Sequence, residues 1–254
     1  MKKITIHQPA YIHEKGRRPN NEDVIFPRVP SDGDRLFMVC DGVGGQDKGE
    51  VAAEIVCTAF STYMNQNPEG SINKSFLESG LRFVELQMKN HVQQYPTTGN
   101  MASTMTLLYF SNTGNTLHLA WVGDSRIYHI RRGCILYRTK DHSQVQSLMD
   151  MGEITEEEAK QHPKKNVLLR AVNGHTPTRM DYKVITNIVS NDFLMLCSDG
   201  ILETLTESQI QQWFLSHYTT KEIRKYIWEN AAGRTRDNFS MILLKVKDIP
   251  LIHN

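Results

Sequence analysis

The middle of the chain constrains the fold most, because residues 101–139 break into apolar runs that are too short for helices. Turn signals separate these runs at Ser111–Asn115, Gly123-Asp124 and Arg132-Gly133. The four runs lie at 104–110, 116–122, 126–130 and 134–138. Short strands that follow one another through tight turns pair antiparallel, so this segment predicts an antiparallel meander.

Helical periodicity flanks these runs on both sides. Residues 49–64 and 74–94 repeat apolar side chains at four-residue spacing, which predicts two amphipathic helices that each pack one face on a sheet. Two more helices are predicted at 206–216 and 219–232, where each segment opens with a capping box. Further strands are expected at 3–12, 23–26, 36–40, 178–189, 192–198 and 239–246. Strict βαβ alternation is missing, so the pattern predicts an α+β fold rather than a Rossmann-like one.

The composition indicates one globular unit. No linker or repeat divides the 254 residues, and 39% of them are hydrophobic, so a single domain over 1–254 is expected. Lys and Arg number 29 against 28 Asp and Glu without a dense basic cluster, which argues against a nucleic-acid partner. Neither a signal peptide nor a membrane-length apolar run is present, so we expect a cytoplasmic protein that does not bind membranes. The four cysteines form no CxxC pair and are expected to be free thiols.

Acidic residues recur where predicted strands begin or end. The runs 36–40 and 193–197 lead into Asp41-Gly42 and, through Ser198, into Asp199-Gly200. Further acidic residues at such positions are Glu22, Asp23, Asp124 and Asp237. One Asp-Gly pair by itself is typical of an ordinary turn. Carboxylates at neighbouring strand ends can converge on shared cations, and all-oxygen ligands favour Mg²⁺ or Mn²⁺ over zinc.

Six ordered motifs make the sequence similar to a known family. They are Arg18-Pro-Asn-Asn-Glu22-Asp23, Asp41-Gly-Val-Gly-Gly45 followed by Gly49-Glu50, Gly123-Asp124-Ser125-Arg126, Asp141-His142-Ser143, Ser198-Asp199-Gly200 and Arg236-Asp237-Asn238. Over about residues 5–246 the chain resembles the bacterial PPM (type 2C) metal-dependent serine/threonine phosphatases. The resemblance implies a four-layer αββα sandwich, in which a central antiparallel β-sandwich is flanked by helix pairs.

The resemblance also implies a metal site that holds two Mn²⁺ or Mg²⁺ ions. By motif position, Asp41 bridges the two ions, and Asp199 and Asp237 complete one site. The other site takes Glu22 and the Gly42 carbonyl. Asp124, together with Asp199, corresponds to a third and weaker metal site.

Two residues and one segment correspond to the family's substrate-handling parts. Arg18 stands at the position of the phosphate-binding arginine, where a guanidinium can hold two phosphate oxygens. Asp23 matches a carboxylate that orients metal-bound waters. Residues 143–175 correspond to a flap beside the substrate, and their capping box and charged residues predict short surface helices.

The sequence departs from the family pattern at three places. Val43 stands where some members have a histidine proposed as general acid, and valine cannot donate a proton. The proton for the leaving group then comes from metal-bound water or another residue. His142 is one candidate, although a structural hydrogen-bonding role is the favoured interpretation. Ala102-Ser103-Thr104 and Val172-Asn173-Gly174 also differ from the usual residues, but neither segment supplies a ligand.

The predicted activity is hydrolysis of phosphoserine and phosphothreonine in proteins by a water that a metal pair activates. The resemblance implies a phosphorylated protein substrate, an opposing serine/threonine kinase and a monomeric enzyme. Two alternatives remain, a non-catalytic phosphoprotein-binding module of the same fold and a hydrolase of small phosphate esters. The complete set of expected carboxylates argues against the module, whereas the sequence does not choose between peptide and small-molecule substrates.

Overall fold

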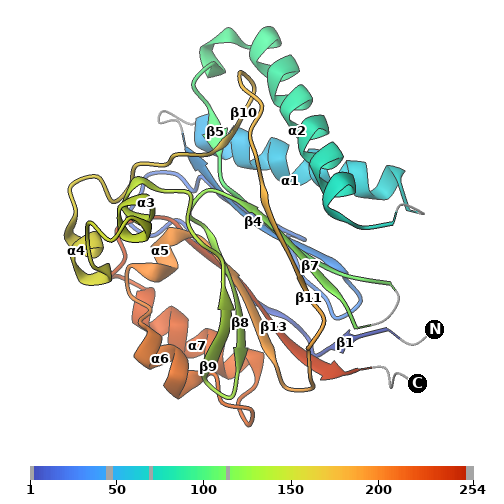
Figure 1. The fold of residues 1–254 in the computed structure, drawn as a ribbon, viewed down its shortest axis with the longest axis vertical. Coiled ribbons are helices and arrows are strands. Elements are labelled where there is room, and N and C mark those ends of the chain that lie inside the picture. The colour runs from blue at the N-terminus through green and yellow to red at the C-terminus, as the bar shows by residue number, and fades with distance from the viewer. Residues whose placement is uncertain (1–2, 44–47, 69–70, 113–114, 250–254) are drawn as a thin grey trace.

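Two antiparallel sheets packed face to face, with helices on both outer faces, form the body of the molecule (Figure 1). The computed structural model describes residues 3–43, 48–68, 71–112 and 115–249. One sheet has the order β1-β13-β12-β8-β9, with β2 also paired to β13. The other has the order β10-β5-β4-β6-β7-β11, with β3 also paired to β4. This arrangement confirms the predicted αββα sandwich.

The strands of the first sheet are β1 (Thr5–Ile6), β2 (Ala10–Glu14), β8 (Arg126–Arg131), β9 (Cys134–Arg138), β12 (Phe193–Cys197) and β13 (Phe239–Asp248). Those of the second are β3 (Asp23–Phe26), β4 (Leu36–Val43), β5 (Ala102–Ser103), β6 (Met105–Phe110), β7 (Leu117–Val122), β10 (Val172–Asn173) and β11 (Asp181–Ile185). The helices are α1 (Lys48–Gln66), α2 (Lys74–Gln94), the 3₁₀ turn η1 (Pro96–Thr98), α3 (Gln144–Asp150), α4 (Glu156–Gln161), α5 (Asp199–Leu202), α6 (Glu207–Trp213) and α7 (Thr220–Ala231).

Three apolar clusters hold the four layers together. One lies between α1, α2 and the second sheet, and one lies between the two sheets. The third joins the first sheet to α5, α6 and α7. Side chains along β13 point alternately to its two faces, so this strand contributes to two clusters. Met241 and Leu243 face the helices, while Ile242 and Leu244 face the other sheet.

The prediction of one continuous meander is wrong at its centre. β6 pairs with β7 and β8 pairs with β9, but these two hairpins belong to different sheets. The chain crosses between the sheets at Gly123, whose φ of +102° lies in the left-handed region that glycine tolerates best. The Gly123-Asp124 signal therefore marks a change of sheet and not a hairpin turn.

Several element bounds also differ from the prediction. The expected strand 3–12 is divided into β1, which ends before Pro9, and β2, which begins directly after it. Proline has no N–H for the hydrogen-bond ladder of a sheet, so it interrupts the strand. The strand expected at 178–189 is shortened to β11, and the helix expected at 206–216 ends at Trp213. The short elements β5, β10 and α5 were not predicted.

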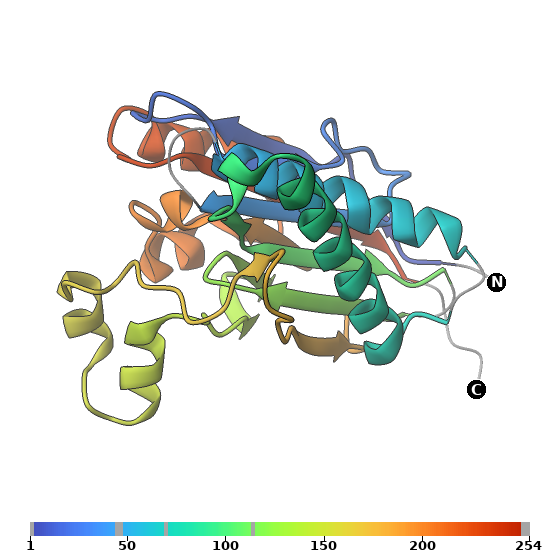
Figure 2. The same ribbon diagram turned by 90° about the horizontal axis from the view of Figure 1, so that it is seen from above.

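The flap (residues 143–175) projects from the sandwich and carries α3 and α4, as Figure 2 shows. Its two ends are joined at the base. The Gln144 amide donates to the Val167 carbonyl at 2.9 Å, and the Leu169 amide donates to the His142 carbonyl at 2.7 Å. The predicted short surface helices are thus confirmed, on a segment that leaves and re-enters the sandwich at one point.

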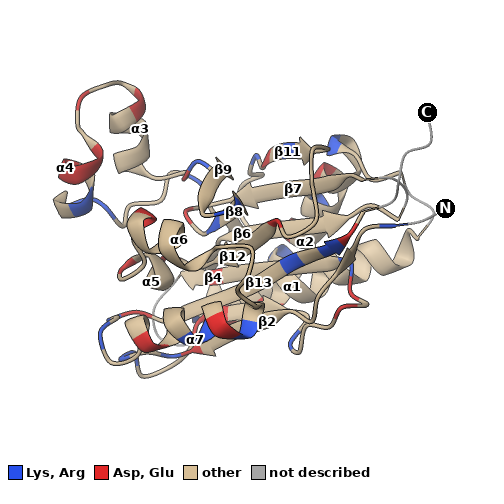
Figure 3. Cartoon of the chain, turned by 90° about the horizontal axis from the view of Figure 1, so that it is seen from below, with Lys and Arg blue, Asp and Glu red and all other residues tan. Residues whose placement is uncertain are grey.

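Surface charge is mixed in the described part of the chain. Lys and Arg lie interspersed with Asp and Glu in Figure 3. None of the helices seen in residues 3–249, outside the gaps, has the length and apolarity that crossing a bilayer requires. The cysteines are free thiols, as predicted, and Cys40, Cys57 and Cys197 are buried while Cys134 is exposed.

Candidate functional site

Asp41 is part of strand β4, so the turn interpretation of Asp41-Gly42 is wrong. Its amide donates to the Thr104 hydroxyl at 2.8 Å, and its carbonyl accepts from the Thr104 amide at 2.8 Å and the Ser103 hydroxyl at 3.1 Å. Asp23 lies opposite Asp41 in the β3–β4 pair. The unusual Ala102-Ser103-Thr104 segment therefore fixes the backbone of Asp41 through two hydroxyl groups.

Asp199 is the first residue of α5, directly after β12. Its carboxyl group lies close enough to that of Asp41 for its charge to raise the pKa of Asp41. The preceding Ser198 donates its hydroxyl to Asp23 Oδ2 at 2.7 Å and accepts from the Ser240 amide at 3.0 Å. Three aspartates from three segments, Asp23, Asp41 and Asp199, are thus linked at one end of the sandwich.

Glu22 and the Gly42 carbonyl meet at Gly49, near the start of α1. A Cβ atom on Gly49 would lie 2.6 Å from the Gly42 oxygen and 2.8 Å from the Glu22 carboxyl carbon. The Gly42 amide also donates to the Glu22 carbonyl at 3.1 Å. Glycine at position 49 therefore lets the helix approach both groups, which places two of the expected ligands side by side.

Asp237 is held by Arg18 in a two-pronged ion pair. Arg18 Nε lies 2.9 Å from Asp237 Oδ1, and its terminal nitrogen lies 2.7 Å from Oδ2. The hydrogen bonds to Asp237 raise the pKa of the guanidinium. The expected phosphate-binding residue and one expected metal ligand are therefore adjacent.

Asp124 follows the crossover glycine. The neighbouring Ser125 hydroxyl is hydrogen-bonded to the Thr104 hydroxyl at 2.7 Å. Arg126 donates two hydrogen bonds to the Asp141 carboxylate, each of 2.7 Å. These bonds tie the end of β7 and the start of β8 to the base of the flap. Asp124 is therefore fixed beside the other aspartates by its neighbours in the motif.

The carboxyl groups of this cluster titrate abnormally, chiefly because the protein encloses them and secondly because they repel one another. The pKa is raised to about 7 for Asp23, about 8 for Asp124 and about 6 for Asp199, and well above its usual range for Asp41. Asp41 interacts electrostatically with Asp23, Asp199, Asp124 and Asp237. The acidic residues that the sequence singled out are therefore close neighbours.

The donor set fits a hard divalent cation. Asp23 Oδ1 and Asp199 Oδ1 are buried without a hydrogen-bond partner, and burying such oxygens is costly unless a cation or proton completes them. The side chains do not form a closed cage, however. Among the described residues, no three His, Cys, Asp or Glu side chains are arranged to coordinate one ion, and Asp237 is bound to Arg18 instead.

A cleft of about 610 Å³ opens beside these carboxylates. Asp124, Asp199 and Asp237 line it from the sandwich, and Glu156 and Lys165 line it from the flap. A molecule bound in this cleft would therefore contact the acidic cluster and the flap together.

His142 lies at the base of the flap, where other residues of the protein contact its ring. Its Nδ1 accepts from the Gly123 amide at 3.1 Å, its Nε2 lies 3.5 Å from Asp181, and its ring stacks on Trp121. Burial, followed by the charge of Arg170, lowers the pKa of its imidazole. Both ring nitrogens have partners within the protein, which supports the structural interpretation over the role of general acid.

Asn238 is the residue whose importance the sequence reasoning missed. Its side-chain oxygen accepts from the Glu22 amide at 2.8 Å, and its nitrogen donates to the Lys15 and Asn20 carbonyls at 2.8 Å each. It thus fixes the loop that carries Arg18 and Glu22. Its place in the Arg236-Asp237-Asn238 motif was the available signal, but only the fold shows what it contacts.

Comparison with known proteins identifies the family. Residues 13–231 match the family model described as Protein phosphatase 2C. This chain belongs to the protein phosphatase 2C family. The predicted family is therefore confirmed, and so is the fold that this family shares.

Other members of the 2C family give more detail. The serine/threonine protein phosphatase PstP of Mycobacterium tuberculosis is 31% identical over 233 residues, which are 91% of this chain but only 43% of that relative. The serine/threonine phosphatase stp of Listeria monocytogenes is 28% identical, with 91% of this chain and 93% of that protein covered. The solved catalytic domain of PstP in complex with two manganese ions superposes with a TM-score of 0.80 at 29% identity, covering 96% of this chain and all of that one.

Proposed function

We propose that this 2C-family chain is a metal-dependent serine/threonine protein phosphatase. The observation that carries the proposal is the meeting of Asp199, Asp124 and Asp237 at one cleft, with Asp41 close to all three, in a chain of this family. The names of the relatives agree with this class of enzyme.

The ligand set that we propose for two Mn²⁺ or Mg²⁺ ions consists of Asp41, the Gly42 carbonyl, Glu22, Asp199 and Asp237, and Asp124 with Asp199 would hold a third ion. The two manganese ions of the PstP catalytic domain support the pair of sites. Bound divalent cations supply Lewis acidity, which activates water for attack on phosphorus and offsets charge on the phosphoryl group.

Arg18 binds the phosphate of the substrate in this proposal. Its side chain is about half exposed and is paired with Asp237, which lines the cleft, and a guanidinium can donate to two phosphate oxygens in parallel. Asp23 is almost fully buried, with one oxygen bonded to Ser198 and the other unpartnered, so it is suited to orient water beside Asp41 and Asp199. The leaving group would take its proton from water, since Val43 has none to donate and His142 is engaged elsewhere.

The physiological setting follows from the same proposal. The substrates would be phosphorylated proteins, and the enzyme would oppose a serine/threonine kinase in the cytoplasm. Residues 1–254 would act as one monomeric catalytic domain. The flap beside the cleft would contact the polypeptide around the phosphorylated residue, since Glu156 and Lys165 line the same space as Asp199.

A titration of the metal tests the proposal. The protein is treated with a chelator, and Mn²⁺ is then added back with phosphoserine, phosphothreonine and phosphotyrosine peptides and p-nitrophenyl phosphate as substrates. We expect saturable, metal-dependent turnover with the first two peptides preferred. Turnover of the small ester alone would indicate a small-molecule hydrolase, and binding of peptides without metal-dependent turnover would indicate a binding module.

A further inference from the structure

Lys245 occupies an unusual place on β13. The side chains of Phe239, Met241 and Leu243 face the helix layer, and Lys245 continues the same row with only 7% of its surface exposed. Its ammonium group donates to the Ser216 carbonyl at 2.7 Å and the Tyr218 carbonyl at 2.9 Å. The ammonium group also lies 5.2 Å from the centroid of the Phe193 ring, so Lys245 brings a positive charge that the protein itself holds in place.

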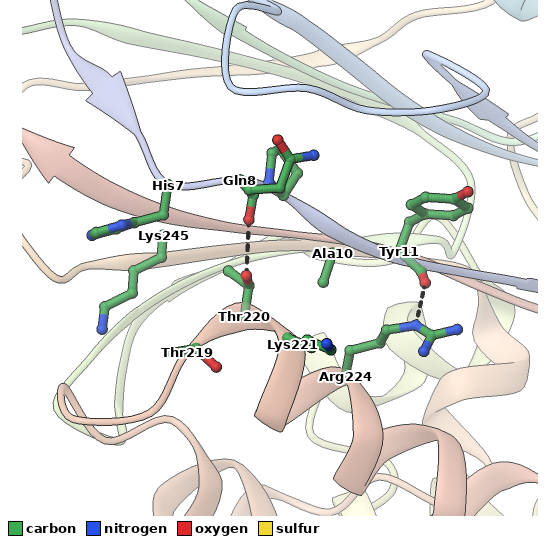
Figure 4. Close-up of a pocket in the computed structure, with 10 residues that line it drawn as sticks. His7, Gln8, Ala10, Tyr11, Thr219, Thr220, Lys221, Arg224 and Lys245 are labelled. Atoms are coloured by element: carbon green, nitrogen blue, oxygen red, sulfur yellow. Dashed lines mark hydrogen bonds between the residues drawn. The ribbon is translucent and has the colours of Figure 1, made fainter.

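Lys245 lines a pocket of about 650 Å³ between residues 7–11 and the start of α7 (Figure 4). Pockets of this size are typical of small-molecule sites. The other cationic side chains that line the pocket are Lys221 and Arg224, and His7 adds an imidazole. The described lining residues include no Asp or Glu. Its lining is otherwise largely apolar, with Pro9, Ala10 and Tyr11 on the strand side.

Two hydrogen bonds fix the walls of this pocket, as the dashed lines in Figure 4 show. Thr220 donates its hydroxyl to the Gln8 carbonyl at 2.9 Å, and Arg224 Nε donates to the Tyr11 carbonyl at 2.8 Å. The pocket is therefore preformed. Arg224 uses Nε–H in this contact, so its terminal amino groups remain for a ligand.

The cations around the pocket disfavour one another. Burial lowers the pKa of His7 first, and the charges of Lys245 and Lys247 lower it further, against a smaller opposing effect of Asp248. Burial also lowers the pKa of the Lys245 ammonium, while the charge of Glu222 opposes this effect. The nearby Glu222 is engaged in capping α7, where it accepts from the Thr219 amide at 2.8 Å and hydroxyl at 2.7 Å. An anion in the pocket would relieve this repulsion.

We propose that this pocket binds a small organic anion. A phosphate, phosphonate or carboxylate group would contact Lys221 and Arg224, and the apolar part would lie against Ala10 and Tyr11. Lys245 would add positive charge from the other end of the pocket. The site is distinct from the acidic cluster, because the six residue steps of β13 from Phe239 to Lys245 alone span roughly 20 Å. The inference does not depend on the proposed phosphatase activity.

The test uses amide chemical shifts of the full chain loaded with Mg²⁺. Phenylphosphonate is the probe, since it joins a non-hydrolysable anionic group to an apolar ring. We expect saturable shifts at the amides of Gln8, Tyr11 and Thr220, with weaker effects of inorganic phosphate and none of neutral benzamide. Any binding at the acidic cluster is reported separately by the amides of Asp41 and Asp199.

Matched variants decide whether the cations cause the binding. Lys221→Gln together with Arg224→Gln should weaken phenylphosphonate about tenfold or more, as expected for lost charge-assisted contacts. Lys225→Gln is the control, because Lys225 lies on the same helix, outside the pocket lining, and is within 3.8 Å of Glu229. If the double variant disturbs the strand, Lys221→Gln alone should still weaken binding by about threefold.

Three outcomes would overturn the proposal. One is the lack of saturable shifts at these amides up to about 10 mM, a concentration that detects even weak complexes. The second is equal affinity in Lys221→Gln and Lys225→Gln. The third is tighter binding of hexaglutamate than of phenylphosphonate, which would make the pocket a docking site for an acidic peptide.

Discussion

Two aspartates flank β12, and their environments are opposite. Asp192 precedes the strand and is fully buried, where it accepts from Arg131 at 2.7 Å, His129 at 2.8 Å and the Val189 amide at 3.0 Å. Burial alone would raise its pKa, but these hydrogen bonds outweigh burial and lower it. Asp199 follows the strand, and burial together with Asp237 and Glu203 raises its pKa to about 6.

The difference shows at which end of β12 the protein itself neutralises the carboxylate. At Asp192 the protein supplies the cation that a buried carboxylate needs, so this residue stabilises the fold. At Asp199 the neighbours are further carboxylates, and the balance of charge requires a bound cation or protons. Raised carboxyl pKa values gathered at a cleft are typical of functional sites.

The largest effect is expected from Asp199→Asn. Loss of one anionic ligand should reduce metal-dependent turnover about 1,000-fold, while the far-UV spectrum and unfolding of the chelated protein stay close to wild type. The control is Asp32→Asn, an exposed aspartate outside the cleft, which should keep full activity. Near-normal turnover of Asp199→Asn would falsify the assignment of Asp199 as a ligand.

The second variant removes the buried carboxylate at the other end of β12. Asp192→Ala should lower the free energy of unfolding by about 3 kcal/mol at pH 7, because it leaves Arg131 and His129 without their carboxylate. The folded pKa of Asp192 lies below the unfolded value of about 3.9, so its contribution is complete above that pH and is lost as the pH falls through the folded pKa.

Denaturant unfolding between pH 2 and pH 7 measures both effects of Asp192. Wild type should lose stability in acid more steeply than the variant, and the specific activity of folded Asp192→Ala should match wild type. If the variant were as stable as wild type at pH 7, the interaction of Asp192 with Arg131 and His129 would not stabilise the fold.

Arg18→Lys tests the cation that forms an ion pair with Asp237 of the acidic cluster. Lysine keeps the charge but not the two-pronged geometry, so kcat/KM should fall about 30-fold with little change in stability. Arg17→Lys, one residue earlier, is the matched control and should change kcat/KM by less than about twofold. Equal losses in the two variants would indicate that only the local charge matters.

The smallest effect concerns stability without metal. Asp124 has a raised pKa, so its charged form disfavours the folded state and stability falls as the pH rises from about 4 towards about 8. In chelator at pH 8, Asp124→Asn should therefore be more stable than wild type by about 1 kcal/mol. At pH 4 the two proteins should unfold alike, and a stabilised variant there would point to packing instead of charge.

The long elements could be predicted from the sequence because their periodicity is local. Helices α1 and α2 and the strands β6 to β9 lie where the apolar pattern predicts them. The change of sheet at Gly123 could not be predicted, since a glycine turn can lead either into a hairpin or across a sandwich. β5 and β10 have two residues each and carry no periodic signal of their own.

The sequence predicted which residues form the site, but not which contacts hold them in place. The motifs singled out the carboxylates that the structure brings together, whereas hydroxyl contacts such as those of Thr104 and Ser198 depend on segments far apart in the chain. The pairing of Arg18 with Asp237 joins residues 219 positions apart and is equally invisible to local patterns. The charged pocket around Lys245 likewise arises only where α7 meets β13.

The ion pair between Arg18 and Asp237 has a kinetic consequence. Nε and one terminal nitrogen of Arg18 now hold Asp237, so the pair of parallel donors on this edge of the guanidinium serves one partner at a time. This edge becomes available to a phosphate after Asp237 has exchanged Arg18 for another positive partner. Loading of the acidic cluster would then precede substrate capture, and phosphopeptide affinity should rise in step with metal occupancy.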